Sequence, residues 1–374
     1  MKKQHSLLFS ATLTYFIIIT AFTLVRILVQ IINVPISIEM LDIIATSIVQ
    51  VGILFCFSIF MFSILRKQKL KKTFLEFGFT KIGLSSIIIS IFIGILCYFL
   101  NISIASFFGS IIRMCGYENV PTFATSSAGD YSTTAFIINV ITVAILPAIC
   151  EETAHRGLLL KGFSTLGIKK SIILSSLLFG LMHLNVNQFF YATVLGFIIA
   201  LTVIISKNIF PAIIIHFMNN FLSVYFDFAT TNNWFASDVY KFFTTILYSE
   251  NFISFFITNC LVLLSLITAI VFLFTILLRE TRIKKVQRTI NDIAKINQEY
   301  NQGSSVYQNN ANMVNLHQLN SLMQQYNIKS LNSMVFTDLE IRTQKATAIE
   351  KLAIISCFVV GGLVTIFTFI WGVI

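Results

Sequence analysis

Long apolar runs constrain this 374-residue chain more than any other feature. A helix rises ~1.5 Å per residue and the hydrocarbon core of a bilayer is ~30 Å thick, so a run of about 18 to 25 apolar residues can cross it. Such runs recur along the whole chain, and charged residues make up only 11% of it. This composition excludes an ordinary soluble domain. The sequence therefore predicts an all-α fold, a polytopic transmembrane helix bundle.

The apolar runs predict eight core spans and a ninth at the C-terminal end. The first run follows Met1-Lys2-Lys3 and is longer than the apolar region of a signal peptide, with no small-residue cleavage site after it, so we interpret it as a retained span. The predicted spans are residues 7–32, 42–65, 83–109, 133–161, 171–187, 189–206, 208–227, 252–278 and 352–374.

Three segments follow from this pattern. Residues 1–278 form one bundle without a Pro/Gly/Ser linker, and its chemistry-bearing core is 133–225. Residues 279–350 begin basic and helical and continue rich in Asn, Gln and Ser, which predicts a cytoplasmic appendix. Its beginning is expected to be either a basic amphipathic helix on an anionic leaflet or a solvated helical hairpin, and a protein partner is one role for it. Residues 352–374 predict a C-terminal transmembrane helix.

The net charge of +10 resides in the connections between spans rather than on one soluble face, so nucleic acid is not an expected partner. The basic connections fall on one side if every predicted span crosses, and most acidic ones fall on the other. By the positive-inside rule, this pattern predicts a multi-pass protein of the cell membrane with a cytoplasmic N-terminus. The six cysteines lie in or beside the spans without CxxC spacing, which favours small packing residues over disulfides.

Three polar clusters interrupt the apolar spans. They are Glu151-Glu152-Thr-Ala-His-Arg156, Phe179-Gly-Leu-Met-His183 and His216-Phe-Met-Asn-Asn220. A charge at mid-bilayer costs ~2.5–3.5 kcal/mol on insertion scales, so such residues are paired or functional. Glu152 and Arg156 are four apart and can pair across one turn, either as structural support or within the site. Glu151 points about 100 degrees away and is left over.

The three clusters lie at similar depths in the bilayer, measured along each helix from the basic residue at its end. At ~1.5 Å per residue, Glu151 lies ~15 Å from Lys161 and His183 ~19 Å from Lys170, while His216 lies ~13 Å and Asn220 ~19 Å from Lys207. These depths coincide, so the three clusters are expected to form one buried polar pocket. A carboxylate and a histidine suffice to activate a water, and a second histidine, His216, with the Asn220 amide would supply donors for an oxyanion.

These groups suit hydrolysis of a peptide bond with water as the nucleophile. Ser175, Ser176 and Cys150 stand in no nucleophile motif, and we interpret them as small packing residues. His5 and His317 lie in polar segments and carry no functional argument.

The ordered set Glu-Glu-x-x-x-Arg, Phe-x-x-x-His and His-x-x-x-Asn resembles the CAAX protease and bacteriocin-processing family, also called Abi, to which the Ras-converting CAAX endopeptidase is related. The resemblance covers about residues 133–225. It implies a helical intramembrane fold and a metal-independent glutamate endopeptidase whose site opens towards the cytoplasmic side. It also implies roles for six residues: Glu151 and His183 as general base, Glu152 and Arg156 as support, and His216 and Asn220 as oxyanion binders.

Two features depart from the family pattern. Thr153-Ala154-His155 stands where bulkier apolar residues are expected, and His155 lies one turn from Glu151, where it could tune or compete for the carboxylate. The appendix and ninth span lie outside the family's core, which suggests a specialised substrate, partner or regulation.

Other interpretations stay open. Glu151, His183 and His216 would supply the two-His, one-carboxylate set of catalytic zinc, although no cofactor is otherwise expected. A transporter would need polar residues along a path, whereas here they form one patch. A non-catalytic membrane scaffold or bacteriocin self-immunity protein is the stronger rival to an intramembrane endopeptidase. The expected substrate is a peptide or membrane protein in contact with the bilayer: a bacteriocin or pheromone precursor, a prenylated CAAX-type peptide, or a membrane protein.

Overall fold

The computed structural model describes residues 5–31, 38–117, 132–247, 251–302 and 345–371. These residues form helices and connections without a strand, which confirms the predicted all-helical fold. Eight helical stretches are long and apolar enough to cross a membrane, which indicates a multi-pass membrane protein. They are Leu7–Val29, Ile43–Leu65, Leu84–Met114, Thr133–Leu166, Val186–Ser206, Phe210–Asn232, Phe252–Thr281 and Ala348–Ile370.

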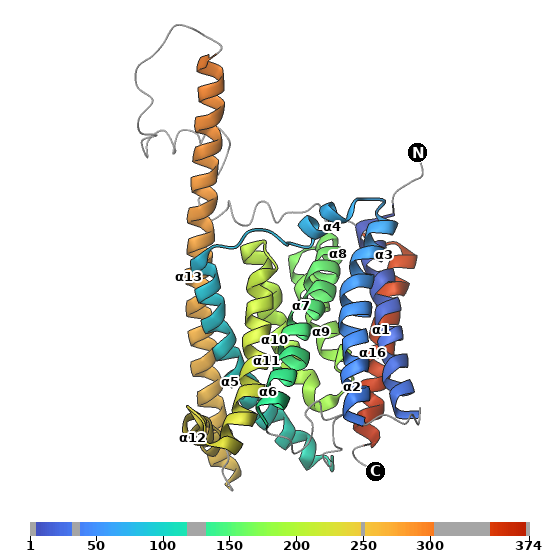
Figure 1. Ribbon diagram of the computed structural model, residues 1–374, viewed down its shortest axis with the longest axis vertical. Helices are drawn as coiled ribbons and strands as arrows, with labels where there is room; N and C mark the ends of the chain where they lie inside the picture. The colour runs from blue at the N-terminus through green and yellow to red at the C-terminus, as the bar shows by residue number, and fades with distance from the viewer. Residues whose placement is uncertain (1–4, 32–37, 118–131, 248–250, 303–344, 372–374) are drawn as a thin grey trace. The chain divides into compact units, whose positions relative to one another are not determined.

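Most of these spans are single helices (Figure 1). Hydroxyl side chains inside them donate to the carbonyl one turn back, as Thr12 does to Leu8 at 2.9 Å, so polar groups in apolar surroundings are satisfied locally. The single helices are α1 (Leu7–Ile31), α5 (Leu84–Met114), α10 (Val186–Ser206), α11 (Phe210–Asn232), α13 (Phe252–Gln302) and α16 (Ala348–Trp371). Two short helices, α4 (Leu70–Glu76) and α12 (Ser237–Leu247), lie in connections.

The second and fourth spans are composite and contain π-helical turns. The second joins α2 (Ile38–Ser47), the π-helix η1 (Ile48–Phe57) and α3 (Ser58–Leu65). The fourth joins α6 (Thr133–Asn139), η2 (Val140–Ile145), α7 (Leu146–Glu152), η3 (Thr153–Leu160), α8 (Lys161–Phe163) and the 3₁₀ turn η4 (Ser164–Leu166), of which η2 and η3 are π-helical. π-Helical turns are rare and frequently accompany functional sites.

The predicted span 171–187 is the one that is shorter than expected. It corresponds to α9 (Ile168–Met182), whose 15 residues extend only ~22 Å and do not meet the length of a full span. The helix ends because Leu184 takes a left-handed backbone conformation with φ 52°. The Asn185 side chain then accepts from the amide of Asn187 at 2.8 Å and begins α10. His183 therefore stands at the end of a helix rather than within one.

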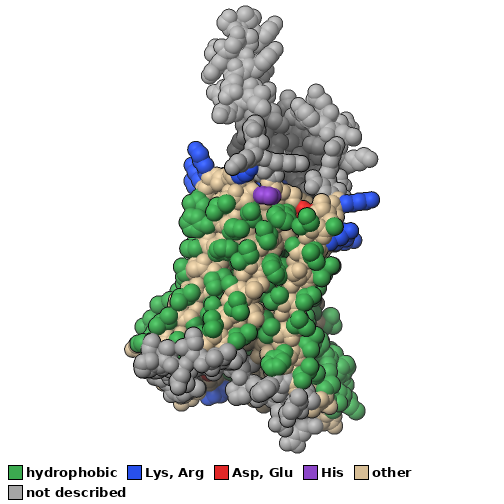
Figure 2. Space-filling view, turned by 90° about the vertical axis from the view of Figure 1, so that its right-hand side faces the viewer, with side chains coloured by type: hydrophobic (Ala, Val, Ile, Leu, Met, Phe, Trp, Pro, Cys, Tyr) green, Lys and Arg blue, Asp and Glu red, His purple; other side chains and the backbone are tan. Residues whose placement is uncertain are grey.

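The basic connections meet at one end of the bundle, where Figure 2 shows most of the visible Lys and Arg side chains. Asn208, between α10 and α11, donates to the carbonyl oxygen of Thr80 at 2.9 Å. Arg66, after α3, donates to the carbonyl oxygen of His5 at 2.6 Å. The predicted grouping of basic connections is thus present in the fold, and hydrophobic side chains cover the flanks (Figure 2).

The C-terminal helix α16 packs against α1. Thr347 and Glu350 form a capping box at its start, with the Glu350 amide donating to the Thr347 hydroxyl at 3.3 Å, and Ser6 donates to the Glu350 carboxylate. A Cβ added to Gly361 would lie 2.9 Å from the Leu181 Cβ in α9, so the helices are in close contact. The predicted ninth span is therefore part of the bundle.

The chain divides into two compact units, Met1–Leu273 with Arg342–Ile374, and Phe274–Ile341. α13 covers both the predicted span 252–278 and the helical start of the predicted appendix 279–350. The rest of the appendix, residues 303–344, including His317, lies outside the described residues. The predicted domain boundaries and the partner role of the appendix stay predictions.

Candidate active site

One helical stretch, α7 continuing into η3, carries the predicted acidic pair. The Glu152 side chain is fully buried, and Glu151 is only 7% exposed. Arg156 Nη1 donates to Glu152 Oε1 at 3.1 Å, and its Nη2 donates to the Gly196 carbonyl of α10 at 3.0 Å. The ion pair predicted from the four-residue spacing is therefore present. The second bond of Arg156, to the Gly196 carbonyl, ties η3 to α10.

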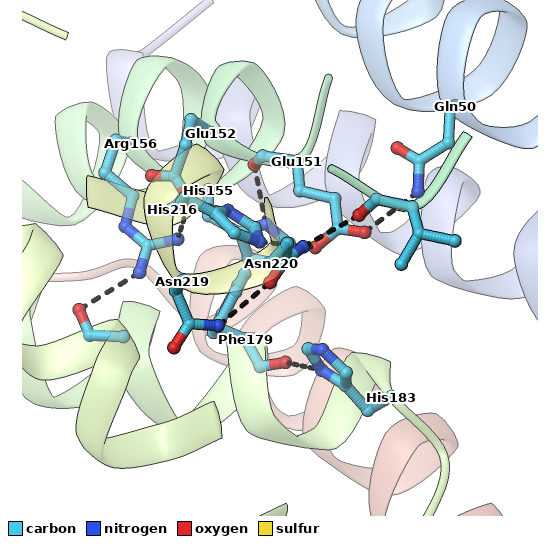
Figure 3. Close-up of polar contacts among 12 residues, drawn as sticks. Gln50, Glu151, Glu152, His155, Arg156, Phe179, His183, His216, Asn219 and Asn220 are labelled. Atoms are coloured by element: carbon cyan, nitrogen blue, oxygen red, sulfur yellow. Dashed lines mark hydrogen bonds and ion pairs between the residues drawn. The ribbon is translucent and has the colours of Figure 1, made fainter. Parts of the chain in front are cut away.

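His216 of α11 lies between the two carboxylates (Figure 3). Its Nδ1 lies 2.8 Å from Glu152 Oε1, and its Nε2 lies 4.0 Å from Glu151 Oε2. Because a carboxylate only accepts, Nδ1 carries the hydrogen and donates to Glu152. Glu151, Glu152, Arg156 and His216 thus form one connected cluster, as the depth argument predicts.

The cluster holds two acidic side chains, Glu151 and Glu152, and one guanidinium, Arg156, and all three are buried. A buried charge is costly unless it is paired, and Arg156 pairs directly with Glu152. Glu151 Oε2 instead faces His216 Nε2.

Glu151 has one oxygen bonded and one unbonded. Gln50 of η1 donates from Nε2 to Glu151 Oε1 at 2.9 Å, whereas Glu151 Oε2 is buried with no hydrogen-bond partner among the described residues. Sequence reasoning missed Gln50. Its signal was an amide side chain within an apolar run, at a position that no motif marks.

Phe179 of α9 occupies the centre of the site. Its ring lies 4.4 Å from Arg156 Cζ, and its centroid lies 5.6 Å from that of His216 and 5.2 Å from that of His183. The four-residue spacing in Phe179-Gly-Leu-Met-His183 thus reflects stacking on one helical face. Phe179 therefore packs against the Arg156 guanidinium and both histidine rings.

His183 lies beyond Phe179, at the end of α9 (Figure 3). Its Nδ1 donates to the Phe179 carbonyl at 2.9 Å, which leaves Nε2 as the acceptor of the neutral ring. Among the described residues no hydrogen bond joins His183 to Glu151, so the two groups predicted to act together are not in direct contact. His183 is half-buried, whereas His216 is buried.

Asn220 belongs to a relay of amide side chains. Asn101 of α5 donates to Asn219 at 2.7 Å, Asn219 donates to Asn220 Oδ1 at 2.9 Å, and Asn220 Nδ2 donates to the Val143 carbonyl of η2 at 3.0 Å. These bonds fix which way the Asn220 amide faces, and its nitrogen keeps a second hydrogen. Asn101 was missed because sequence does not show which spans are neighbours, and Asn219, which lies within the third polar cluster, was given no role of its own.

His155 is now explained by its contacts. Its Nδ1 lies 2.8 Å from the main-chain carbonyl oxygen of Glu151, and its Nε2 lies 2.9 Å from the hydroxyl of Tyr15 in α1. A carbonyl only accepts, so Nδ1 donates and Nε2 accepts from Tyr15. His155 therefore touches the backbone of Glu151 rather than competing for its carboxylate, and it links the site to α1.

The zinc alternative needs Glu151, His183 and His216 to converge. Within the described ranges, no group of three His, Cys, Asp or Glu side chains is placed to hold a metal ion. The contact drawn for His183 is its bond to the Phe179 carbonyl, not to either carboxylate (Figure 3). The predicted ligand set does not form, and the question of metal dependence belongs to experiment.

Comparison with known proteins gives one finding. Residues 133–222 match a family model described as type II CAAX prenyl endopeptidase Rce1-like. The matched segment runs from α6 to α11 and includes all six predicted site residues, Glu151, Glu152, Arg156, His183, His216 and Asn220, whereas Gln50, Asn101 and Tyr15 lie before it. No curated protein matches the chain, and no solved structure does.

Proposed function

Because residues 133–222 belong to the Rce1-like type II CAAX prenyl endopeptidase family, a membership that implies a protease, we propose that this chain is an intramembrane endopeptidase that hydrolyses a peptide bond with a water activated by Glu151. The resemblance first drawn from three short motifs is confirmed by the family match. Proteases of this family do not need a metal ion, in keeping with a mechanism carried by side chains.

One observation carries the proposal. Glu151 Oε2 is a buried carboxylate oxygen without a hydrogen-bond partner among the described residues, and it faces His216 Nε2 at 4.0 Å. A separation of this length is of the kind that one water bridges. The same oxygen belongs to a carboxylate whose other oxygen is held by Gln50, so the free lone pairs have a fixed direction.

The chemical step follows from this placement. Glu151 Oε2 takes a proton from the water while the water oxygen forms a bond to the carbonyl carbon of the scissile peptide. The carbon–oxygen π electrons move to the carbonyl oxygen, which becomes an oxyanion. When the carbon–nitrogen bond then breaks, the proton passes to the departing amine, and Glu151 is again ionised. General-base catalysis of this kind contributes about 10²–10⁴-fold in rate.

Three other residues have supporting roles in this proposal. The second hydrogen of Asn220 Nδ2 donates to the oxyanion, and the amide relay from Asn219 holds it in place. His216, held by Glu152, turns its Nε2 towards Glu151 Oε2 and helps to hold the water there. His183 Nε2, fixed by the bond from Nδ1 to Phe179, faces the substrate side and accepts or returns a proton there.

We propose a peptide or membrane-protein segment at the basic, cytoplasmic half of the bilayer as the substrate. The predicted classes are a bacteriocin or pheromone precursor, a prenylated CAAX-type peptide, and a membrane protein. The buried position of the cluster, within spans that also face lipid, favours a substrate that itself partitions into the membrane.

The test compares membrane peptidomes from cells that carry wild type, Glu151→Gln or His183→Ala. Products that depend on the protein should disappear with Glu151→Gln and fall strongly with His183→Ala. Asp227→Asn is a matched control, because it removes an exposed carboxylate from the same helix as His216. Persistence of the same products in Glu151→Gln would exclude hydrolysis by this site and favour the scaffold or immunity interpretation.

A chelator test addresses zinc separately. Purified protein in lipid vesicles, dialysed against a strong chelator and assayed in metal-free buffer, should cleave the identified peptide at its original rate. Loss of cleavage that returns on adding Zn²⁺ would instead support a metal site.

A further inference from the structure

A side chain outside the family-matched segment contacts the proposed general base directly. Gln50 lies in η1, on the second span, and its Nε2 donates to Glu151 Oε1 at 2.9 Å (Figure 3). Gln50 is only 7% exposed. Gln50 lies outside the matched segment, which starts at residue 133.

The hydrogen bonding of Gln50 is one-sided. Its amide oxygen is buried without a partner among the described residues, so only half of the side chain is satisfied by the protein. A buried unsatisfied polar atom costs about 1–3 kcal/mol. If Gln50 served packing alone, an apolar residue of similar shape would fill the same space without leaving a buried polar atom unpaired. We therefore take the contact with Glu151 as the role of this glutamine.

The contact also fixes the geometry of the reacting oxygen. A carboxylate can rotate about its last torsion, which is broad. With Oε1 held by Gln50, the plane of the carboxylate is set and Oε2 faces His216 Nε2. The π-helical backbone of η1 brings this residue to α7, with which η1 is in contact.

We propose that Gln50 is a positioning residue of the hydrolytic site: its amide nitrogen holds one oxygen of Glu151 so that the other faces the attacking water. The inference rests on the proposed function. It adds a second-span residue to a site otherwise built from residues 133–222.

Other charged and titratable groups surround Glu151, and they stay unchanged in the test. They are His216 from α11, Glu152, His155 and Arg156 from its own helical stretch, His183 from α9, and Tyr15 from α1. A change confined to Gln50 variants is therefore attributable to the lost amide.

The first experiment uses full-length protein in lipid vesicles and the peptide identified from the peptidome. Gln50→Leu should lower kcat by about 10- to 10²-fold, the cost of a misplaced reacting group, with little change in KM. The acid side of its pH profile should move to higher pH, because the ionised carboxylate loses a donor. Gln50→Glu should recover activity as the pH falls, because a protonated carboxyl donates as the amide does.

Controls separate positioning from folding. Gln68→Leu removes an amide that bonds Thr73, away from the site, and should leave kcat and the pH profile unchanged. Gln50→Met provides a second apolar variant if Gln50→Leu unfolds. Wild-type kcat and pH profile in a folded Gln50→Leu or Gln50→Met protein, with Glu151→Gln inactive, would overturn the inference and leave the proposed function standing.

A second measurement does not depend on substrate. Infrared spectra of the purified protein contain carboxyl bands. In the difference between the wild-type and Glu151→Gln spectra, the band that is lost belongs to Glu151. That band should change frequency in Gln50→Leu and not in Gln68→Leu. An unchanged band would overturn the inference even if Glu151→Gln turned out to be active and the proposed function had failed.

Discussion

At the scale of single residues, two neighbouring carboxylates differ in the partners of one oxygen. Both keep a buried Oε2 without a hydrogen-bond partner among the described residues, but Glu152 Oε1 accepts from Arg156 and His216, whereas Glu151 Oε1 accepts from Gln50. Glu152 is therefore the carboxylate that is tied into the fold by a charged partner, and Glu151 is not. If Glu152 supports the fold and Glu151 acts as the base, variants at the two positions should differ in stability as well as in activity.

We expect Glu152→Gln to destabilise the protein strongly. Removing one partner of a buried ion pair costs about 3–5 kcal/mol, since Arg156 would keep its charge without a counterion. Glu151→Gln should cost much less, because the Glu151 carboxylate accepts a hydrogen bond from Gln50 and a glutamine oxygen can accept the same bond. Thermal unfolding of both variants in the same detergent, followed by tryptophan fluorescence, measures this difference. Equal losses of stability would contradict the division of roles.

Asn219→Ala tests the amide relay. The variant removes the donor to Asn220 Oδ1 at 2.9 Å, so the Asn220 amide is free to turn away from the reacting carbonyl. Deleting an oxyanion donor costs about 10²–10³-fold in kcat, which we expect for Asn220→Ala, and Asn219→Ala should cost less. The measurement is kcat for each single variant and for the double variant. Residues that act through one another give losses that do not add, so the double variant should be no slower than Asn220→Ala. Additive losses would refute the relay.

Sequence alone predicted the site residues that lie in short motifs and missed those that reach it from distant spans. Glu152 and Arg156 are neighbours by helical spacing, so their pairing was predictable. Gln50, Asn101 and Tyr15 carry no motif, and their roles depend on which spans are adjacent, which periodicity does not determine. The depth argument treated His183 as part of a full span, and it could not show that α9 ends at Met182 or that His183 Nδ1 bonds the Phe179 carbonyl.

At the scale of elements, the π-helical turns gather the polar contacts. η1 carries Gln50, η2 supplies the Val143 carbonyl that accepts from Asn220, and η3 carries His155 and Arg156. Hydropathy predicts that these stretches cross the membrane but not that their backbone departs from an α-helix. For the same reason the short α9 was predicted as a full span: an apolar pattern does not show where a left-handed residue ends a helix.

Close packing of α9 on α10 is required to hold Phe179 and Gly196 next to Arg156. A Cβ added to Gly180 would lie 2.9 Å from the Phe189 carbonyl oxygen, whereas one added to Gly362 would meet nothing within 4 Å. Gly180→Ala should therefore lower stability by about 1–3 kcal/mol through overpacking.

Gly362→Ala is the matched control, since both substitutions carry the same gain in helix propensity of about 1 kcal/mol. It should leave the unfolding temperature unchanged or slightly raised. Differential scanning fluorimetry of the two variants compares them directly. A Gly180→Ala protein as stable as Gly362→Ala would mean that α9 and α10 are less tightly packed than the structure shows.

At the scale of the whole molecule, the asymmetry of charge has a consequence for orientation. The connections at Arg66–Lys72, Lys161–Lys170 and Lys207 lie at one end of the bundle, and crossing α5 leads from Lys81 at that end to Cys115 at the other. Basic connections are retained in the cytoplasm. If the rule holds here, the proposed substrate is reached from the cytoplasmic half, and Cys115 faces the opposite compartment.

Single-cysteine labelling tests this orientation. In a protein with its other cysteines replaced by alanine, Cys115 is exposed and should react with a membrane-impermeant maleimide in intact cells. Lys207→Cys in a background without Cys115 should react only after the membrane is permeabilised, because it lies at the basic end. Blocking by prior maleimide treatment provides the control for expression. Labelling of Lys207→Cys in intact cells, with Cys115 protected, would reverse the topology and place the basic end of the bundle outside the cytoplasm.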